Sequence, residues 1–126
     1  MRAILDTSVV LATGIGELPG DLAISAATLA ELHFGVLVAA DSATRAERLR
    51  RLTQIERLFD PVPVDDRVAR SYGMLAAAVV ERGRQPRARA MDLLIAATAH
   101  ANNARLYTAN ARDLYGLDEL LEIVEI

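Results

Sequence analysis

Two hydrophobic patterns alternate along this chain: short apolar runs, and longer segments in which apolar residues recur at helical spacing. The apolar runs predict strands at 3–5, 22–24 and 105–108, with a final short strand at 122–126. The longer segments predict helices at 7–12, 25–39, 41–58, 66–81 and 92–102, and one helical turn at 110–114. This alternation predicts an α/β fold: a three-layer α/β/α sandwich around a short, mostly parallel sheet.

Local residue types refine several of these elements. Ser25 is well placed to cap the helix that follows it. That helix is apolar on nearly every side, which predicts that it is buried or lies in an interface. The prolines of F-D-P-V-P-V at 59–64 predict a strand that is short or at a sheet edge. Loops are predicted at 14–20 and 82–89. The G-x-G of the first loop is a weak phosphate-binding candidate, because it does not open a helix directly after a strand.

Length and composition indicate a single domain, residues 1–126. The chain has 126 residues, of which 52% are hydrophobic, enough to bury a core without disulfides or a structural metal. There is no cysteine, which excludes disulfide scaffolds, thiol chemistry and zinc sites built on cysteine. Asp6 interrupts the first apolar stretch, so no signal peptide is predicted, and no apolar run could cross a bilayer without a charge inside it. We therefore expect a cytoplasmic protein with no membrane partner.

The charged residues narrow the function classes further. The formal net charge is −3, which argues against a protein dedicated to nucleic-acid binding. All 14 basic residues are arginine, whose planar guanidinium suits phosphate and carboxylate partners. Receiver domains and haloacid-dehalogenase-type phosphatases also place an aspartate after a first strand, but both normally need a lysine near the phosphoryl group. The absence of lysine comes close to excluding them.

Four acidic residues fall where a parallel sheet would bring them together. Asp6 ends the first strand, and Glu31 lies in the second turn of the helix after the second strand. Asp92 opens the last long helix, and Asp113 follows the strand R-L-Y-T. Ligands gather at the carboxyl ends of the strands in such sheets, and the helices packed on the sheet begin at the same edge. We therefore expect these four carboxylates to reach one site.

Each acid also has a local explanation that needs no active site. Asp6 or Asp92 could be an ordinary helix cap, and Asn110 with Asp113 has the spacing of a capping pair. Glu31 fits this explanation poorly. It lies on a helix too apolar to accommodate a lone carboxylate, and burying one without a partner is costly.

Converging carboxylates would favour a divalent metal. Mutual repulsion raises the pKa of clustered carboxyl groups, and a cation relieves it. Oxygen ligands, with no cysteine and no histidine cluster at metal-ligand spacing, indicate Mg²⁺ or Mn²⁺ rather than zinc. Such an ion activates water and stabilises the charge that develops on a phosphodiester. The pattern therefore predicts a metal-dependent phosphodiesterase.

The chain resembles the PIN domain in four segments that occur in the family's order: D-T-S at 6–8, E-L-H-F-G at 31–35, M-D-L-L-I-A-A-T-A at 91–99 and T-A-N-A-R-D-L at 108–114. More narrowly, it resembles the VapC-type ribonuclease toxins of bacterial VapBC toxin–antitoxin pairs, over essentially the whole chain. The resemblance implies a PIN-like fold and a Mg²⁺- or Mn²⁺-dependent endoribonuclease in which an activated water is the nucleophile. It also implies a VapB-type antitoxin whose tail blocks the site, and a homodimer.

The resemblance assigns roles to individual residues. The catalytic and metal-binding acids would be Asp6, Glu31, Asp92 and Asp113. Ser8 would support Asp6, and Thr108 and Asn110 would shape the same pocket. Leu114 stands where the family often has an aromatic residue, and we expect it to pack rather than react.

Several other residues have both a functional and a structural interpretation. The arginines near the predicted site could contact RNA phosphate or an antitoxin, or could simply lie in solvent; they are Arg82, Arg84, Arg87, Arg89 and Arg112. The arginine-rich helix at 45–57 is predicted to be a solvated face or an antitoxin surface. His33 and His100 are predicted to be core or interface residues, and Tyr72, Met74 and Leu75 to be core.

One functional alternative remains open at this point. The chain could be a catalytically inactive PIN-fold interaction module, in which the acids are relics or bind only an antitoxin-like partner. The intact set of four acids argues against this alternative, since a relic would be free to lose one.

Overall fold

The sheet of the computed structural model contains five strands in the order β3-β2-β1-β4-β5, and every described pair is parallel. The strands are β1 (Arg2–Leu5), β2 (Asp21–Ser25), β3 (Pro61–Val62), β4 (Arg105–Thr108) and β5 (Ile123–Glu125). The structure describes residues 1–12 and 17–126, so the G-x-G at 14–16 lies outside the described residues. The predicted strands are confirmed, and the proline-containing β3 is a two-residue strand at the sheet edge.

Within residues 1–12 and 17–126, five α-helices and two short 3₁₀ turns connect the strands. They are α1 (Thr7–Leu11), α2 (Ala26–Leu37), α3 (Ser42–Leu58), α4 (Asp66–Glu81), η1 (Pro86–Arg89), α5 (Ala90–Ala101) and η2 (Ala111–Leu114). All of the predicted helices are confirmed within a few residues. In the described part of the chain, no helix is both long enough and apolar enough to span a membrane.

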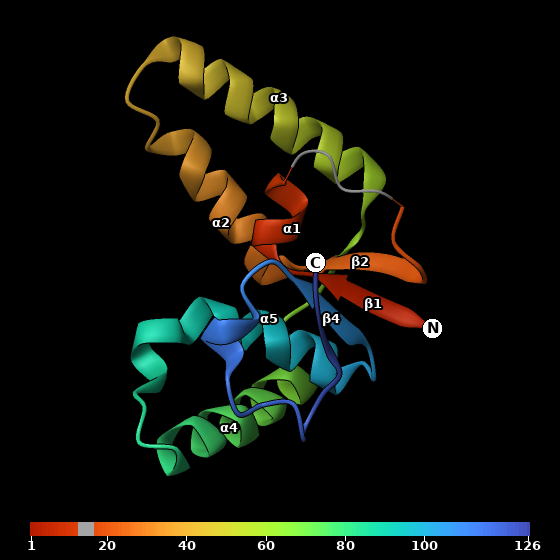
Figure 1. Ribbon diagram of the computed structural model, residues 1–126. Helices are drawn as coiled ribbons and strands as arrows, with labels where there is room; N and C mark the ends of the chain where they lie inside the picture. The colour runs from red at the N-terminus through yellow and green to blue at the C-terminus, as the bar shows by residue number, and fades with distance from the viewer. Residues whose placement is uncertain (13–16) are drawn as a thin grey trace.

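Helices cover both faces of the sheet, which confirms the three-layer α/β/α architecture (Figure 1). Successive residues of β1 point to opposite faces. Ile4 packs into the cluster formed with α4 and α5, while Ala3 and Leu5 pack with Val9 of α1 and Ile55 of α3. β1 is therefore buried on both sides, as expected for a central strand of a parallel sheet. This burial fixes the carboxyl end of β1 at the middle of the sheet edge.

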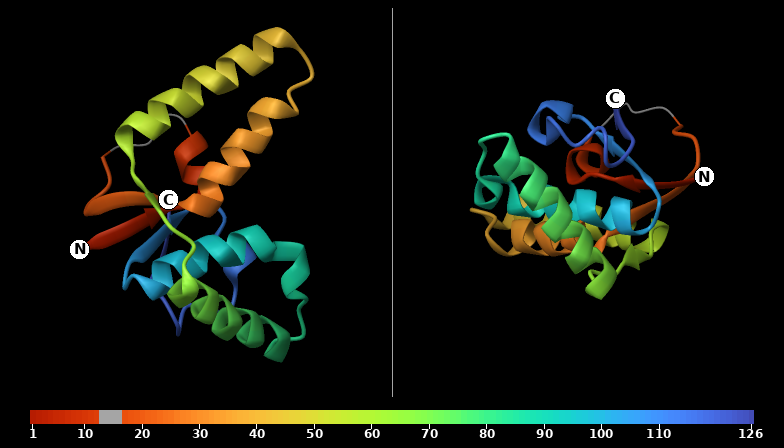
Figure 2. Two further views of the ribbon diagram at one scale, coloured as in Figure 1. Left: turned by 180° about the vertical axis from the view of Figure 1, so that it is seen from behind. Right: turned by 90° about the horizontal axis from the view of Figure 1, so that it is seen from below.

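The helices α2 and α3 form an antiparallel pair that projects away from the sheet (Figures 1 and 2). Only part of α2 is covered by the rest of the chain, and Phe34, Leu37 and Val38 near its end are exposed. The prediction that this apolar helix is buried is wrong for these three residues. The alternative prediction, that it lies in an interface, stays open.

The start of α2 is fixed by a buried hydroxyl. The Ser25 Oγ accepts a hydrogen bond from the Ala27 amide at 3.1 Å, which confirms the predicted cap. The same oxygen lies 2.8 Å from the Thr98 Oγ1 of α5. Ser25 therefore both starts α2 and joins it to the helix that carries Asp92.

The segment before α5 is more helical than predicted. Residues 86–89 of the expected 82–89 loop form η1, which begins at Pro86 because the fixed φ of proline suits the first position of a helical turn. α5 then begins at Ala90, so Asp92 is its third residue rather than its first.

The buried face of α4 separates correct from incorrect core predictions. Leu75 is fully buried and Tyr72 partly buried, but Met74 is exposed, so its predicted core position is wrong. The reason is the helical spacing of the residues that α4 buries, which are Val68, Ser71, Leu75 and Val79.

The two histidines differ. His100 Nδ1 lies 2.8 Å from the Ser71 Oγ and is partly buried, consistent with a packing role. His33 is exposed at the surface of α2, 3.8 Å from a carboxylate oxygen of Glu56, so the prediction of a core position is wrong. Because Glu56 belongs to α3, the side chain of His33 lies on the side of α2 that faces α3, and it is exposed there.

Candidate active site

The four predicted acids all follow the carboxyl ends of strands or begin the helices at that edge. Asp6 comes directly after β1, where its amide donates to the Tyr107 carbonyl of β4 at 2.9 Å. Glu31 lies in the second turn of α2, Asp92 in the first turn of α5 and Asp113 in η2. Residues separated by up to 107 positions in the sequence thus reach one edge of the sheet because the strands between them are parallel.

The carboxylate of Asp6 is oriented by a hydroxyl on the neighbouring strand. Thr108 is fully buried, and its Oγ1 donates to the Asp6 Oδ2 at 2.6 Å. The same Oγ1 accepts a hydrogen bond from the Asn110 amide at 3.1 Å, which fixes the direction of its proton. Thr108 therefore fixes one oxygen of Asp6, and the backbone of Asn110 in turn fixes Thr108.

Ser8 makes no hydrogen bond to Asp6 among the described residues. Its Oγ accepts a hydrogen bond from the Ala109 amide at 3.1 Å and so holds the segment after β4 against α1. The hydroxyl that donates to Asp6 is that of Thr108, so direct support of Asp6 by Ser8 stays a prediction. Ser8 acts on the site through the loop that it fixes.

Glu31 is oriented by a residue that the sequence patterns did not single out. The Thr7 Oγ1 donates to the Glu31 Oε1 at 2.7 Å. Since that proton is used, the buried Thr28 hydroxyl, 3.0 Å away, donates to Thr7 in turn. The signal in the sequence was the hydroxyl of Thr7, directly after Asp6. In the structure this hydroxyl is directed to Glu31 of α2 rather than to the carboxylate of Asp6.

The pKa of Asp92 is affected by burial and by the other three acids. Burial raises the pKa of its half-buried carboxyl group, and the charges of Asp6, Asp113 and Glu31 raise it further. The guanidinium of Arg89 opposes these effects. The charges of all three other acids therefore act on the carboxyl group of Asp92.

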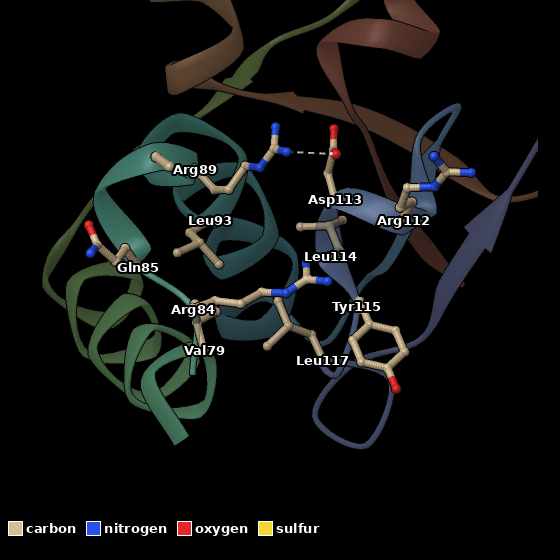
Figure 3. Close-up of a pocket in the computed structure, with 11 residues that line it drawn as sticks. Val79, Arg84, Gln85, Arg89, Leu93, Arg112, Asp113, Leu114, Tyr115 and Leu117 are labelled. Atoms are coloured by element: carbon tan, nitrogen blue, oxygen red, sulfur yellow. Dashed lines mark ion pairs between the residues drawn. The ribbon is translucent and has the colours of Figure 1, made fainter. Parts of the chain in front are cut away.

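Asp113 is paired with an arginine from the opposite wall of a cavity. The Arg89 Nη2 lies 3.2 Å from the Asp113 Oδ1, and the ion pair crosses the gap between η1 and η2 (Figure 3). The two side chains are 48% and 29% exposed, so solvent screens the pair. Of the five arginines identified from the sequence, Arg89 is the one that reaches an acidic residue of the site.

The other four arginines are divided. Arg84 and Arg112 line the same cavity, whereas Arg82 does not line it and has its guanidinium carbon 5.8 Å from the centre of the Tyr115 ring. Arg87 is exposed and does not line the cavity. In the basic run at 82–89, Arg84 of the loop and Arg89 of η1 therefore line the cavity. Arg82 lies near Tyr115, and Arg87 lies in solvent.

The capping explanations are not supported for the site acids. Asp6 is the residue before α1 and Asn110 the residue before η2, but neither side chain makes a capping hydrogen bond in the described structure. Asp92 lies inside α5, two residues after its start. Asp41 and Asp65, by contrast, do cap α3 and α4, which shows what ordinary capping aspartates look like in this chain.

The donor set fits a hard divalent cation. Within residues 1–12 and 17–126, protein groups donate to one oxygen of Asp6 and one of Glu31, and Arg89 pairs with one oxygen of Asp113. The remaining carboxylate oxygens of the four acids receive no hydrogen bond from the described residues, which leaves lone pairs for a ligand. Carboxylate oxygens are the donors that Mg²⁺ and Mn²⁺ prefer.

The carboxylates are not already gathered around one point. Among the described residues, no three acidic or histidine side chains are close enough together to form a ready-made metal centre. The carboxyl group of Asp92 is nevertheless affected by the charges of the other three acids, which a bound cation would offset.

The PIN domain family matches residues 3–120. Ribonuclease VapC5 of Mycobacterium tuberculosis is 42% identical over 102 residues, which are 76% of this chain and 73% of that protein. Ribonuclease VapC8 of the same organism is 40% identical over 100 residues, 76% of this chain and 88% of that protein.

Solved structures agree with the sequence matches. The crystal structure of VapBC-5 from M. tuberculosis, a member of the VapBC family of toxin–antitoxin systems, superposes with a TM-score of 0.87 at 36% identity, over 99% of this chain and 98% of that one. FitAcB from Neisseria gonorrhoeae follows with a TM-score of 0.77 at 25% identity, over 98% and 96% of the two chains. The chain therefore belongs to the PIN-domain family and, within it, to the VapC-type proteins.

Proposed function

We propose that this protein is a Mg²⁺- or Mn²⁺-dependent endoribonuclease and the toxin of a toxin–antitoxin pair. The observation that carries the proposal is geometric: four acids lie at the carboxyl edge of one parallel sheet, where Thr108 and Thr7 donate hydrogen bonds to Asp6 and Glu31. Four acids at this edge are suited to hold a cation. The relatives named ribonuclease VapC5 and VapC8 support the reaction class.

Asp6, Glu31 and Asp92 would hold the cation, with Asp113 completing the acidic site. When bound there, such an ion lowers the pKa of a water and neutralises charge on a phosphodiester. The protein's own contribution is orientation: Thr108 fixes one oxygen of Asp6 and Thr7 one oxygen of Glu31, and the other oxygen of each would be available to a cation. Arg89 supplies a positive charge at the rim that can meet an RNA phosphate.

The proposed partner is a VapB-type antitoxin, and we also propose that the toxin forms a homodimer and acts in the cytoplasm, where its RNA substrates are. The VapBC-5 neighbour is a toxin–antitoxin structure, which supports an antitoxin. Phe34, Leu37 and Val38 give α2 an exposed apolar surface of the kind that partners cover.

Cleavage of total RNA by the purified protein tests this proposal. Wild type is assayed with Mg²⁺, with Mn²⁺ and with EDTA, beside Asp92→Asn. We expect fragments only when wild type has a metal. Cleavage that persists in EDTA would overturn the metal-dependent mechanism.

Binding of Mn²⁺, measured by calorimetry, separates the alternatives. Metal binding without cleavage of total RNA would indicate a narrow substrate and would be followed by a search with defined RNAs. The absence of both binding and cleavage would reject the enzyme and leave the inactive interaction module.

A further inference from the structure

A cavity of about 380 Å³ opens beside the acidic site, between the segment that follows α4 and the turn η2 (Figure 3). We refer to it as the arginine pocket. Its lining residues are Val79, Arg84, Gln85, Ala88, Arg89, Leu93, Arg112, Asp113, Leu114, Tyr115 and Leu117. Asp113 belongs both to this pocket and to the acidic site, so the two are continuous.

The floor and the rim of the arginine pocket differ in chemistry. The floor is formed by buried apolar residues, among them Leu93, Leu114 and Leu117. The rim carries Arg84 and Arg89, which extend across the gap from the same wall (Figure 3). An apolar floor below two guanidinium groups suits a ligand that has a flat apolar part and a negative charge.

The far wall supplies an aromatic face. Tyr115 is 62% exposed, and the guanidinium of Arg84 lies 5.3 Å from the centre of its ring. The guanidinium carbon of Arg82 also lies near the ring, 5.8 Å from its centre. Arg82 can take this position because Gly116 has no side chain, and a Cβ at residue 116 would collide with the Arg82 side chain. Gly116 also has a φ of +90°, a conformation that favours glycine. The ring is therefore held in place while remaining accessible to a ligand.

The contacts that cross the pocket are exchangeable. Arg89 is paired with Asp113 in a partly exposed ion pair, and Arg84 lies near an exposed ring. Neither guanidinium is locked by a backbone carbonyl among the hydrogen bonds of the described residues. A phosphate could take the place of the Asp113 carboxylate at Arg89, and a base could stack against Arg84 or Tyr115.

We propose that the arginine pocket is a nucleotide-binding subsite, which holds the base of the RNA residue next to the scissile phosphate while Arg89 contacts phosphate. The proposal rests on the proposed ribonuclease function and adds the part of the substrate that the protein reads. The pocket volume falls within the range of small-ligand sites, and RNA bases that are recognised outside a helix stack on aromatic rings or arginine planes. Arg112 lines the same cavity, but its guanidinium points away from the opposite wall (Figure 3).

Nucleotide binding without metal tests the subsite directly. The probes are the four nucleoside 5′-monophosphates, with ribose 5-phosphate as the probe that lacks a base, titrated in EDTA and followed by amide chemical shifts. We expect at least one nucleotide to shift the amides of residues 84, 115 and 117, and ribose 5-phosphate to bind about tenfold more weakly. Equal binding of ribose 5-phosphate would overturn the base-binding part of the proposal.

Matched variants connect the binding to the pocket. Arg84→Ala and Tyr115→Ala should each weaken nucleotide binding about tenfold, with Tyr115→Phe close to wild type. Arg87→Ala is the control, because it removes the same charge from η1, outside the pocket, and should change binding less than about twofold. A loss in Arg87→Ala equal to that in Arg84→Ala would show nonspecific charge attraction and overturn the subsite.

Two further outcomes distinguish failures of the subsite from failures of the enzyme. If wild type cleaves RNA and Tyr115→Ala cleaves the same sites with the same base preference, the subsite is wrong and the ribonuclease stands. If an acidic peptide shifts the pocket amides and no nucleotide does, the pocket belongs to a protein partner and the proposal fails. Binding of nucleotides by a protein that neither binds Mn²⁺ nor cleaves RNA would overturn the ribonuclease alone.

Discussion

Two cavities border the acidic site, and they use arginine in opposite ways. The arginine pocket meets the site at Asp113. A second cavity of about 340 Å³, here called the α2–α3 groove, meets it at Glu31. The groove is lined by Thr7, Leu11, Glu31, Leu32, Gly35, Arg48, Arg51, Leu52 and Ile55.

The difference lies in what each guanidinium already binds. In the groove, Arg48 donates to the Gly35 carbonyl at 2.7 Å and Arg51 to the Leu11 carbonyl at the same distance. These bonds tie α3 to the ends of α2 and α1, so both arginines act as structural ties. In the pocket, Arg89 pairs with an acid and Arg84 lies over a ring. The presence of arginine near an active site is therefore weak evidence for substrate binding until its present partner is known.

The largest expected effect comes from removing an acid of the site that both cavities border. Asp92→Asn should lower RNA cleavage by more than about a hundredfold, since loss of a ligand exceeds the tenfold to hundredfold cost of losing a residue that only orients one. The same variant should unfold at a higher temperature than wild type in EDTA. Because the folded-state pKa of Asp92 is raised, its ionised form destabilises the fold at neutral pH, and that penalty disappears as the pH falls below about 4.

Cleavage assays and thermal unfolding of the same samples check this prediction. Asp60→Asn is the control, since Asp60 is exposed and precedes the edge strand β3, which β2 separates from β1. It should change neither measurement. A lower unfolding temperature for Asp92→Asn in EDTA would contradict the electrostatic account.

A second, smaller effect compares the two hydroxyls that orient the acids. Thr108→Val on the strand side and Thr7→Val on the groove side should each lower cleavage about tenfold to a hundredfold, because the carboxylates lose their fixed orientation. Weaker Mn²⁺ binding by calorimetry should accompany both losses. Ser8→Ala should affect Mn²⁺ binding less, since the hydrogen bond that Ser8 accepts comes from the backbone of 109. Equal losses in all three variants would mean that loop position, rather than carboxylate orientation, controls the site.

The order of elements and the four acids could be predicted from the sequence because both follow from local rules. The apolar run of residues 3–5 predicted a buried strand, and parallel topology then sent Asp6 and Asp113 to the same edge. The roles of the hydroxyls could not be predicted in this way. Thr7 and Ser8 are adjacent and chemically similar, and only the path of α1 decides that Thr7 faces Glu31 and Ser8 faces residue 109.

The arginines show a second limit of sequence reasoning. Arg84 and Arg87 lie three residues apart in one basic run and both are exposed, yet Arg84 lines a cavity and Arg87 does not. Arg84 lies in the loop before η1, whereas Arg87 belongs to that turn, so the chain changes conformation between them. No periodic pattern in R-G-R-Q-P-R-A-R announces such a short turn, although Pro86 marks where it begins.

A third prediction compares one arginine from each cavity, Arg51 as a structural residue and Arg84 as a nucleotide-binding residue. Arg51→Ala should lower the free energy of unfolding by about 1 kcal/mol, because the Leu11 carbonyl loses its charged donor, and should leave nucleotide binding unchanged. Arg84→Ala should have the reverse profile, with weaker nucleotide binding and a change in unfolding free energy within about 0.5 kcal/mol. Urea unfolding and the nucleotide titration are measured on both variants. Loss of stability in Arg84→Ala and loss of binding in Arg51→Ala would reverse the assignment of the two cavities.

The smallest expected effect concerns the wall of the groove alone. The Asp41 carboxylate accepts a hydrogen bond from the Thr44 amide at 2.7 Å, and this bond to the start of α3 holds the pKa of Asp41 below its usual value. A lowered folded-state pKa contributes stability at neutral pH that is lost as the pH falls through that pKa. Asp41→Ala should therefore unfold at a slightly lower temperature than wild type at neutral pH, with the difference shrinking in acid, while Asp41→Asn keeps the cap and loses the pH dependence. RNA cleavage should be unchanged in both variants, because the cap of α3 contacts neither the four acids nor the arginine pocket. A loss of cleavage in Asp41→Ala would mean that the α2–α3 pair controls the site from a distance.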